Sequence, residues 1–167
     1  MLRARLGPYP APNADTIAAL RQVYGRMSEA GIGRRQGAAV QVAQLEDGSY
    51  MVGASGQEAK ASHIRQAVPP PEGMRWAADA VPFRRDELVF SPDGHLYCGG
   101  AECAEPKVLL SRGDGVAVTS QATMWYGMDN RFPLSPDLLG GGSLMRPCYS
   151  CLQHAERLLH APELLRH

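Results

Sequence analysis

The sequence lacks an excess of charge of either sign, a long apolar run and an apolar leader. Its 17 basic residues balance 17 acidic ones, so no net field draws the chain to nucleic acid or to an anionic membrane. No stretch approaches the roughly 18 consecutive apolar residues of a membrane-spanning helix. The opening residues 1–5 lack the core of a signal peptide, and prolines follow at once. These absences predict a cytoplasmic chain that does not bind membranes.

Cysteine is also scarce, with four residues in the chain. Four cysteines could form two disulfides in a secreted protein, but two of them lie in a Cys-x-x-Cys pair and no signal peptide precedes them. This combination favours metal binding. The remaining composition is that of an ordinary globular protein, 44% hydrophobic and 20% charged. A length of 167 residues predicts one domain, 1–167, with a core of its own.

Two short motifs carry the candidate chemistry. Cys148 and Cys151 lie three residues apart at the predicted start of a helix, and this spacing puts both sulfurs on one side of its first turn. The sulfurs suit two of the four tetrahedral positions around zinc. Cys103 can supply a third thiolate and leave one position open for water, to and from which the carboxylate of Glu105 can carry protons. Three ligands, a vacancy and a carboxylate indicate a catalytic zinc site.

These motifs resemble the zinc-dependent, cytidine deaminase-like superfamily, in which His-x-Glu or Cys-x-Glu is followed by Pro-Cys-x-x-Cys. The runs Cys103-Ala104-Glu105 and Pro147-Cys148-Tyr149-Ser150-Cys151 are most similar to the YwqJ-like bacterial deaminases, a branch proposed to contain toxins. The resemblance implies bound Zn²⁺, Glu105 as the catalytic proton carrier, and hydrolytic deamination of cytosine or adenine. The base would belong to a nucleoside, a nucleotide or a single-stranded nucleic acid. A toxin would also be delivered into a target cell and have an immunity protein as partner.

Cys98 opens an alternative. It forms Cys-x4-Cys with Cys103 and could join Cys148 and Cys151 in a closed, four-cysteine structural site. The chain would then be a non-enzymatic, zinc-stapled interaction domain, which has no need of Glu105. We favour the catalytic site, and we expect Cys98 to be a small buried thiol at the end of an apolar strand.

The first half of the chain predicts a helix and a hairpin. Apolar residues recur at helical spacing over 15–30, with Asn13 or Asp15 as the cap. Residues 38–46 read as a strand, and the Asp47-Gly48 turn predicts an antiparallel partner directly after it.

The second half places both motifs at helix starts. Pro106 is acceptable only in a first turn, which predicts a helix over 103–112. A strand over 116–125 and a last helix over 148–160 follow. The resulting order, helix-strand-strand-helix-strand-helix, resembles the deaminase core. The expected fold is therefore α/β, a three-layer α/β/α sandwich with a mixed central sheet.

Three segments fit this scheme less closely. The proline-rich residues 1–12 predict an extended arm, and 56–97 predict an insertion or lid, with Trp76 in a short helical stretch and a second hairpin over 88–97. The family sheet continues after the second zinc helix, but only seven residues follow His160. The fourth and fifth strands are therefore expected to be missing, very short or supplied by the second hairpin.

Side chains outside the motifs carry weaker expectations. The only two asparagines, Asn13 and Asn130, are the candidates for a family-like ribose contact. The aromatic residues near the end of the third strand are expected to pack in the core rather than stack on a base: Trp125, Tyr126 and Phe132.

Overall fold

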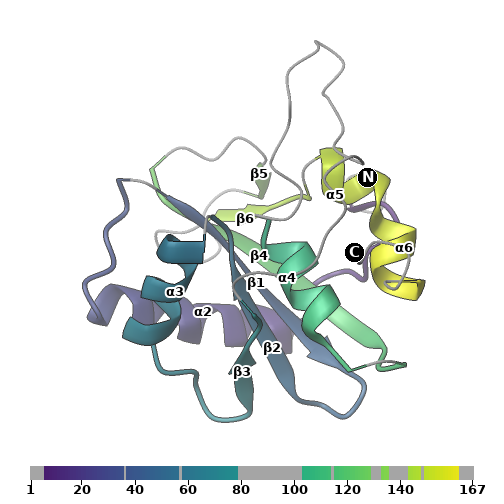
Figure 1. The fold of residues 1–167 in the computed structure, drawn as a ribbon, viewed down its shortest axis with the longest axis horizontal. Coiled ribbons are helices and arrows are strands. Elements are labelled where there is room, and N and C mark those ends of the chain that lie inside the picture. The colour runs from purple at the N-terminus through teal and green to yellow at the C-terminus, as the bar shows by residue number, and fades with distance from the viewer. Residues whose placement is uncertain are drawn as a thin grey trace.

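The computed structural model describes residues 6–35, 37–56, 58–78, 103–113, 115–128, 133–135, 143–147 and 149–161. These residues form a mixed six-stranded sheet with helices packed against it (Figure 1). The predicted α/β class is confirmed. Within the described ranges, no helix is both long enough and apolar enough to cross a lipid bilayer.

Helix α2 (Ala14–Glu29) begins at Asn13, one of the two predicted caps. The Asn13 side chain accepts a hydrogen bond from the Thr16 backbone at 2.8 Å, and the Thr16 hydroxyl accepts one from the Asn13 backbone at 3.0 Å. This reciprocal capping box satisfies amides that would otherwise lack partners at the helix start. The buried face of α2 then packs on the sheet through Ala19, Leu20, Val23 and Met27.

Strands β1 (Ala38–Leu45) and β2 (Tyr50–Ala54) form the predicted antiparallel hairpin. Gly48 has a φ of 84°, which a glycine adopts without strain. The Asp47 carboxylate accepts hydrogen bonds from the Ser49 hydroxyl at 2.6 Å and the Ser49 backbone at 2.9 Å. These bonds, led by the one from the hydroxyl, lower the pKa of Asp47. The turn chemistry therefore fixes the register of the two strands.

Strand β4 (Val118–Tyr126) pairs antiparallel with β1 on the side away from β2. Two short strands follow, β5 (Pro133–Ser135) and β6 (Ser143–Met145). With β3 (Met74–Trp76) at the other edge, the strand order is β3-β2-β1-β4-β6-β5. Both strands are only three residues long and precede the second motif, whereas the family strands would follow the second zinc helix, where residues 162–167 lie outside the described part of the chain. The hairpin predicted over 88–97 lies outside the described residues.

The other edge of the sheet is formed by part of the segment predicted as an insertion. Helix α3 (Glu58–Ala67) is followed by β3 (Met74–Trp76), which runs parallel to β2. The prediction of a helical stretch at Trp76 was wrong, because this residue lies in β3 and its indole nitrogen donates a hydrogen bond to the Val68 carbonyl at 2.8 Å. Backbone pairing with β2 outweighs the weak local preference of this stretch for a helix.

Helices cover both faces of the sheet. α2 packs on the face that carries Val40, Val42 and Met124, whereas α4 (Ala104–Ser111) lies on the opposite face, where Val108 packs on Ala43 (Figure 1). Because successive side chains of a strand point to opposite faces of the sheet, the residues of β1 and β4 face α2 and α4 in turn. The predicted last helix is divided at His154 into α5 (Tyr149–Gln153) and α6 (Ala155–His160), and α6 packs against α4.

The α4 helix approaches β2 most closely at Gly53. A Cβ atom there would lie 2.6 Å from Val108 Cγ2 and 3.3 Å from the Ala104 carbonyl oxygen. We expect Gly53→Ala to lower the free energy of unfolding by about 1–3 kcal/mol, because overpacking forces the helix to shift. Chemical denaturation measures this loss. The control is Gly25→Ala in α2, where the added methyl meets nothing within 4 Å and should stabilise by about 0.5–1 kcal/mol. Equal effects of the two changes would contradict the close approach.

Candidate metal and catalytic site

The first motif lies at the start of α4, as predicted. Cys103 is the N-cap residue and Glu105 lies in the first turn, followed by Pro106 at a position where its missing N–H costs nothing. Cys103 is 7% exposed and Glu105 is 4% exposed. Burying a carboxylate this deeply costs free energy unless polar groups bind it. The polar contacts of Glu105 therefore bear directly on its role.

The buried Glu105 carboxylate contacts the second motif. Its Oε1 accepts a hydrogen bond from the Thr123 hydroxyl at 3.3 Å, and its Oε2 lies 3.8 Å from the Cys151 sulfur, which donates to it. Cys151 is 1% exposed and comes 46 residues later in the chain. The fold therefore brings the proposed proton carrier and one proposed metal ligand into direct contact.

The Cys151 helix is held in place by the N-terminal segment. The Tyr9 hydroxyl donates a hydrogen bond to the Cys151 carbonyl at 2.8 Å, and the Tyr9 ring packs with Leu109 of α4 and Leu158 of α6. The described part of the segment predicted as an extended arm, from Leu6 onward, turns back on itself through a bond from the Tyr9 amide to the Leu6 carbonyl. This arm is part of the packing around the site, a role that the sequence did not reveal.

Three of the predicted site residues can be placed, Cys103, Glu105 and Cys151. Cys148 and the alternative ligand Cys98 lie outside the described residues. Among the residues that are described, which include Cys103, Glu105 and Cys151, no three metal-binding side chains gather into one group. Cys103 and Cys151 are buried thiols that are not joined in a disulfide. Sulfur donors at the starts of two helices, beside a carboxylate, are the kind of set that zinc binds. The residues present therefore fit the metal that the motifs predict.

The sheet beneath α4 presents a row of polar side chains to the site. Gln121, Thr123 and Trp125 alternate along β4 on the α4 face, and Thr123 is the one that holds Glu105. Gln41 of β1 lies directly opposite Thr123 in the register. A small hollow opens beside Thr123, lined also by Leu6, Pro12, Gln121, Ala122, Leu134, Leu144, Met145 and Pro147.

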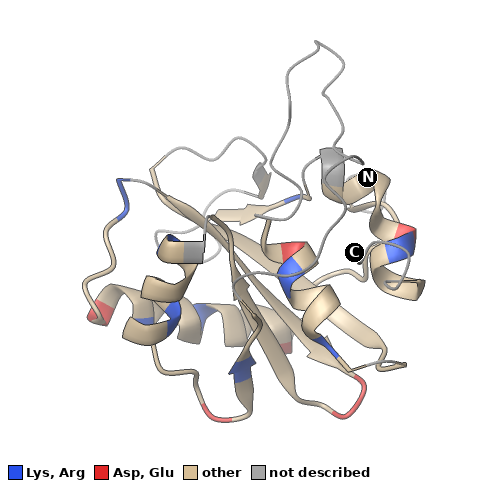
Figure 2. Cartoon of the chain, viewed as in Figure 1, with Lys and Arg blue, Asp and Glu red and all other residues tan. Residues whose placement is uncertain are grey.

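The charged residues near the site belong to helices rather than to the central strands. β1, β2 and β4 contain no charged residue, and Figure 2 shows charged residues on the surrounding helices and loops. Lys107 is 1% exposed, and its ammonium donates to the carbonyls of Ala54 at 2.9 Å and Gly56 at 2.8 Å. Lys60 donates to the Gly37 carbonyl nearby, and burial lowers its pKa. Lys107 thus holds the segment that follows β2, and Lys60 holds the residue that precedes β1.

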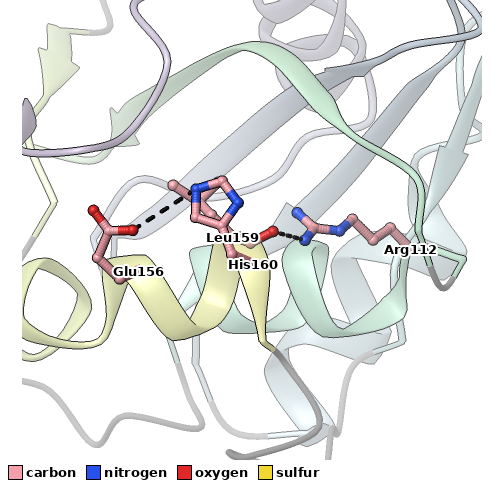
Figure 3. A network of polar contacts seen from close by, with 4 residues as sticks. All are labelled: Arg112, Glu156, Leu159 and His160. Carbon is pink, nitrogen blue, oxygen red and sulfur yellow. Dashed lines mark hydrogen bonds and ion pairs between the residues drawn. The ribbon is translucent and has the colours of Figure 1, made fainter.

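The C-terminal end of α4 is linked to α6 by Arg112. Its guanidinium donates to the Leu159 carbonyl of α6, as Figure 3 shows. The neighbouring pair Glu156–His160 is 3.7 Å long and lies on the surface, with side chains 74% and 70% exposed. Such an exposed pair contributes little to stability, whereas Arg112 and the apolar contacts of Leu109, Leu110 and Leu158 hold α6 against α4.

Two of the weaker expectations can be resolved. Asn13 is committed to structure, because it caps α2 and also bonds Ser120 at 2.9 Å and Gln44 at 3.0 Å. Asn130 and Phe132 lie outside the described residues. Tyr126 packs in the core on the α2 face, as expected, and its hydroxyl donates to the Ile32 carbonyl at 2.8 Å.

Comparisons with known proteins yield no match, neither to a family model, nor to a curated protein, nor to a solved structure. The function therefore has to be inferred from the residues of the site. The contacts of the buried Glu105 carboxylate with Cys151 and Thr123 are the basis for inferring that function.

Proposed function

We propose that this chain is a zinc-dependent hydrolytic deaminase of a nucleobase, with a cytidine deaminase-like fold and of the bacterial toxin type. The observation that carries the proposal is the contact between Glu105 and Cys151. Two motifs that resemble one family's catalytic signature are separated in sequence, yet the fold joins them at a buried carboxylate. A structural zinc site has no use for such a carboxylate.

Cys103, Cys148 and Cys151 would hold the zinc ion. Bound zinc supplies a nucleophilic water near neutral pH by lowering the pKa of that water. Glu105 is placed to take one proton from the attacking water and deliver it to the ring nitrogen, and then to pass the second proton to the departing amine. The water oxygen becomes the new carbonyl oxygen, the exocyclic carbon–nitrogen bond breaks, and ammonia leaves, so all atoms are conserved.

Burial of Glu105 suits this role. The carboxylate is 4% exposed, so bulk water does not compete for its protons. The Thr123 hydroxyl bonds one oxygen, and the other is directed at Cys151. A fixed carboxylate loses no orientation when a substrate enters.

The balanced charge of the chain favours a small or short substrate. Binding of long nucleic acid depends on neutralising phosphates with a basic surface, whereas 17 basic and 17 acidic residues cancel here. Free nucleosides, nucleotides and short single strands are therefore the substrates to test first. Ammonia release from adenosine, cytidine, their monophosphates and short DNA and RNA oligonucleotides tests the proposal, and no release from any of them would contradict it.

Thr123→Val tests whether the hydroxyl positions the proton carrier. Valine keeps the shape of threonine but removes the bond to Glu105 Oε1. We expect kcat to fall about tenfold, since a hydrogen bond to a charged group contributes roughly 1.5 kcal/mol. Zinc should be retained, and the dependence of kcat on pH should change because the Glu105 carboxylate has lost a hydrogen bond. Thr119→Val removes a bond to the Gln44 carbonyl on the exposed end of β4 and should leave kcat unchanged. Equal kcat for the two variants would show that Thr123 plays no positioning role.

A further inference from the structure

A fully buried carboxamide without partners lies in the middle of the sheet. Gln41 in β1 is 0% exposed, and neither its Oε1 nor its Nε2 has a hydrogen-bond partner in the described part of the chain. Burying an unpaired amide is unfavourable because its bonds to water are lost and not replaced. An unsatisfied group of this kind in a native fold calls for a ligand, a water or a functional reason.

Gln41 lies beneath the first turn of α4. In the register of the sheet its neighbours are Gly53 on one side and Thr123 on the other. The Ala104 carbonyl oxygen of α4 lies over Gly53, 3.3 Å from where a Cβ would be, and Thr123 holds Glu105. Opposed side chains in a sheet are neighbours. The Gln41 carboxamide is therefore adjacent to the residue that positions the proposed proton carrier.

The unsatisfied side-chain atoms of the described sheet residues lie on this one face. Gln121 Oε1 and Trp125 Nε1 are also buried without a partner among the described residues, and both flank Thr123 on β4. Buried polar groups at the opposite helix are paired, for example the hydroxyls of Thr16 and Ser120, which lie 3.0 Å apart. The missing hydrogen bonds are thus a property of the α4 face, where a polar ligand would complete them.

We propose that Gln41 reads the nucleobase and selects adenine over cytosine, an inference that rests on the proposed deaminase function. A carboxamide offers a donor and an acceptor side by side, which matches N7 and the N6 amine of adenine. N7 lies across the amine-bearing carbon from N1, the nitrogen that Glu105 would protonate. Gln41 and Glu105 would then flank that carbon. Cytosine presents a C–H group at the corresponding place, so Nε2 would stay buried and unpaired, and such a mismatch discriminates strongly.

Gln41→Met tests this assignment, because methionine has a similar length and no amide. We expect KM for adenosine or an adenine oligonucleotide to rise about 10–100-fold, the value of a bidentate contact, and the preference over cytidine to shrink. The thermal midpoint without substrate should be unchanged or higher, since an unsatisfied group has been removed. Gln44→Met is the control in the same strand: Gln44 bonds Asn13 and Tyr50, so the midpoint should fall while KM stays the same.

A lower midpoint with unchanged KM for Gln41→Met would overturn the inference and assign Gln41 to structure, for example to a buried water. A wild-type preference for cytidine would overturn it as well. Calorimetry of adenosine and cytidine binding to the Glu105→Gln protein tests base recognition without requiring the reaction to occur. It therefore distinguishes a failure of the base-reading role from a failure of the proposed deaminase function. Adenosine binding that depends on Gln41 supports the base-reading role even if no ammonia is ever released. Deamination that is indifferent to Gln41 supports the reaction and overturns the role.

Discussion

Glu105→Gln is expected to lower deaminase turnover by about 10²–10⁴-fold while zinc stays bound and the fold stays intact. Glutamine keeps the shape of the side chain, and its amide oxygen can still accept the bond from the Thr123 hydroxyl. It cannot take up or release a proton near neutral pH, so both proton transfers to the substrate would be lost. Steady-state ammonia release measures the effect, and metal analysis with a thermal melt establishes that the protein is otherwise unchanged.

The matched control for this change is Glu156→Gln on α6. The Glu156 side chain is 74% exposed and pairs only with the surface residue His160 in the described structure, so the substitution should leave turnover unaltered. If Glu105 served only the dipole of α4, its replacement would change stability by about 0.3–1 kcal/mol and activity hardly at all. Turnover that survives Glu105→Gln on a substrate that the wild type deaminates would refute the mechanism.

Replacing Cys103, Cys148 or Cys151 by serine should in each case remove most of the zinc. We expect the wild-type protein to bind one zinc ion per chain. Cys103 and Cys151 are buried at the starts of α4 and α5, and the ion would join these two helices. Because the binding energy of such a site is coupled to folding, the thermal midpoint should fall with the metal. Atomic emission of the purified proteins measures zinc content, and chelator treatment of the wild type should reproduce the loss of stability.

Cys98→Ser separates the catalytic site from the four-cysteine alternative. If zinc has three protein ligands, this variant keeps one ion per chain, because Cys98 lies outside the ligand set. Metal loss as large as that of Cys103→Ser would transfer the assignment to a closed structural site and remove the case for catalysis. Unchanged zinc in all three single variants of the proposed ligands would refute the site itself.

The elements that could be predicted from the sequence are those with local causes. The cap at Asn13, the turn at Asp47-Gly48 and the first-turn position of Pro106 each follow from the backbone preferences of a few adjacent residues. Strands β1 and β4 are eight and nine residues long, which is enough for a strand pattern to be recognised. The order of the long helices and strands could therefore be predicted from these local features.

The three short strands had no such signal. β3, β5 and β6 contain three residues each, too few to show a period, and they exist because neighbouring strands offer unpaired backbone groups. The break at His154 between α5 and α6 is equally a product of packing, since the apolar spacing continues across it. Such features depend on partners far away in the sequence.

The candidate site divides in the same way. Cys103, Glu105 and Cys151 could be singled out because their spacing follows from metal chemistry, although only the fold shows that Glu105 contacts Cys151. Thr123 and Gln41 went unnoticed. The available signal was a polar residue near the middle of each strand, and their direct pairing in the register puts both on one face of the sheet. Tyr9 gave no signal, because its partner lies 142 residues away.

The bond from Tyr9 to Cys151 has a consequence for biosynthesis. During translation β1, β2, α4 and β4 all leave the ribosome before α5, so Glu105 is made without the thiol that it contacts in the finished protein. Contacts of such long sequence separation form late, after the entropy of closing the intervening chain has been overcome. We therefore expect the surroundings of Glu105 to be completed only when α5 and α6 have been made and have docked against α4.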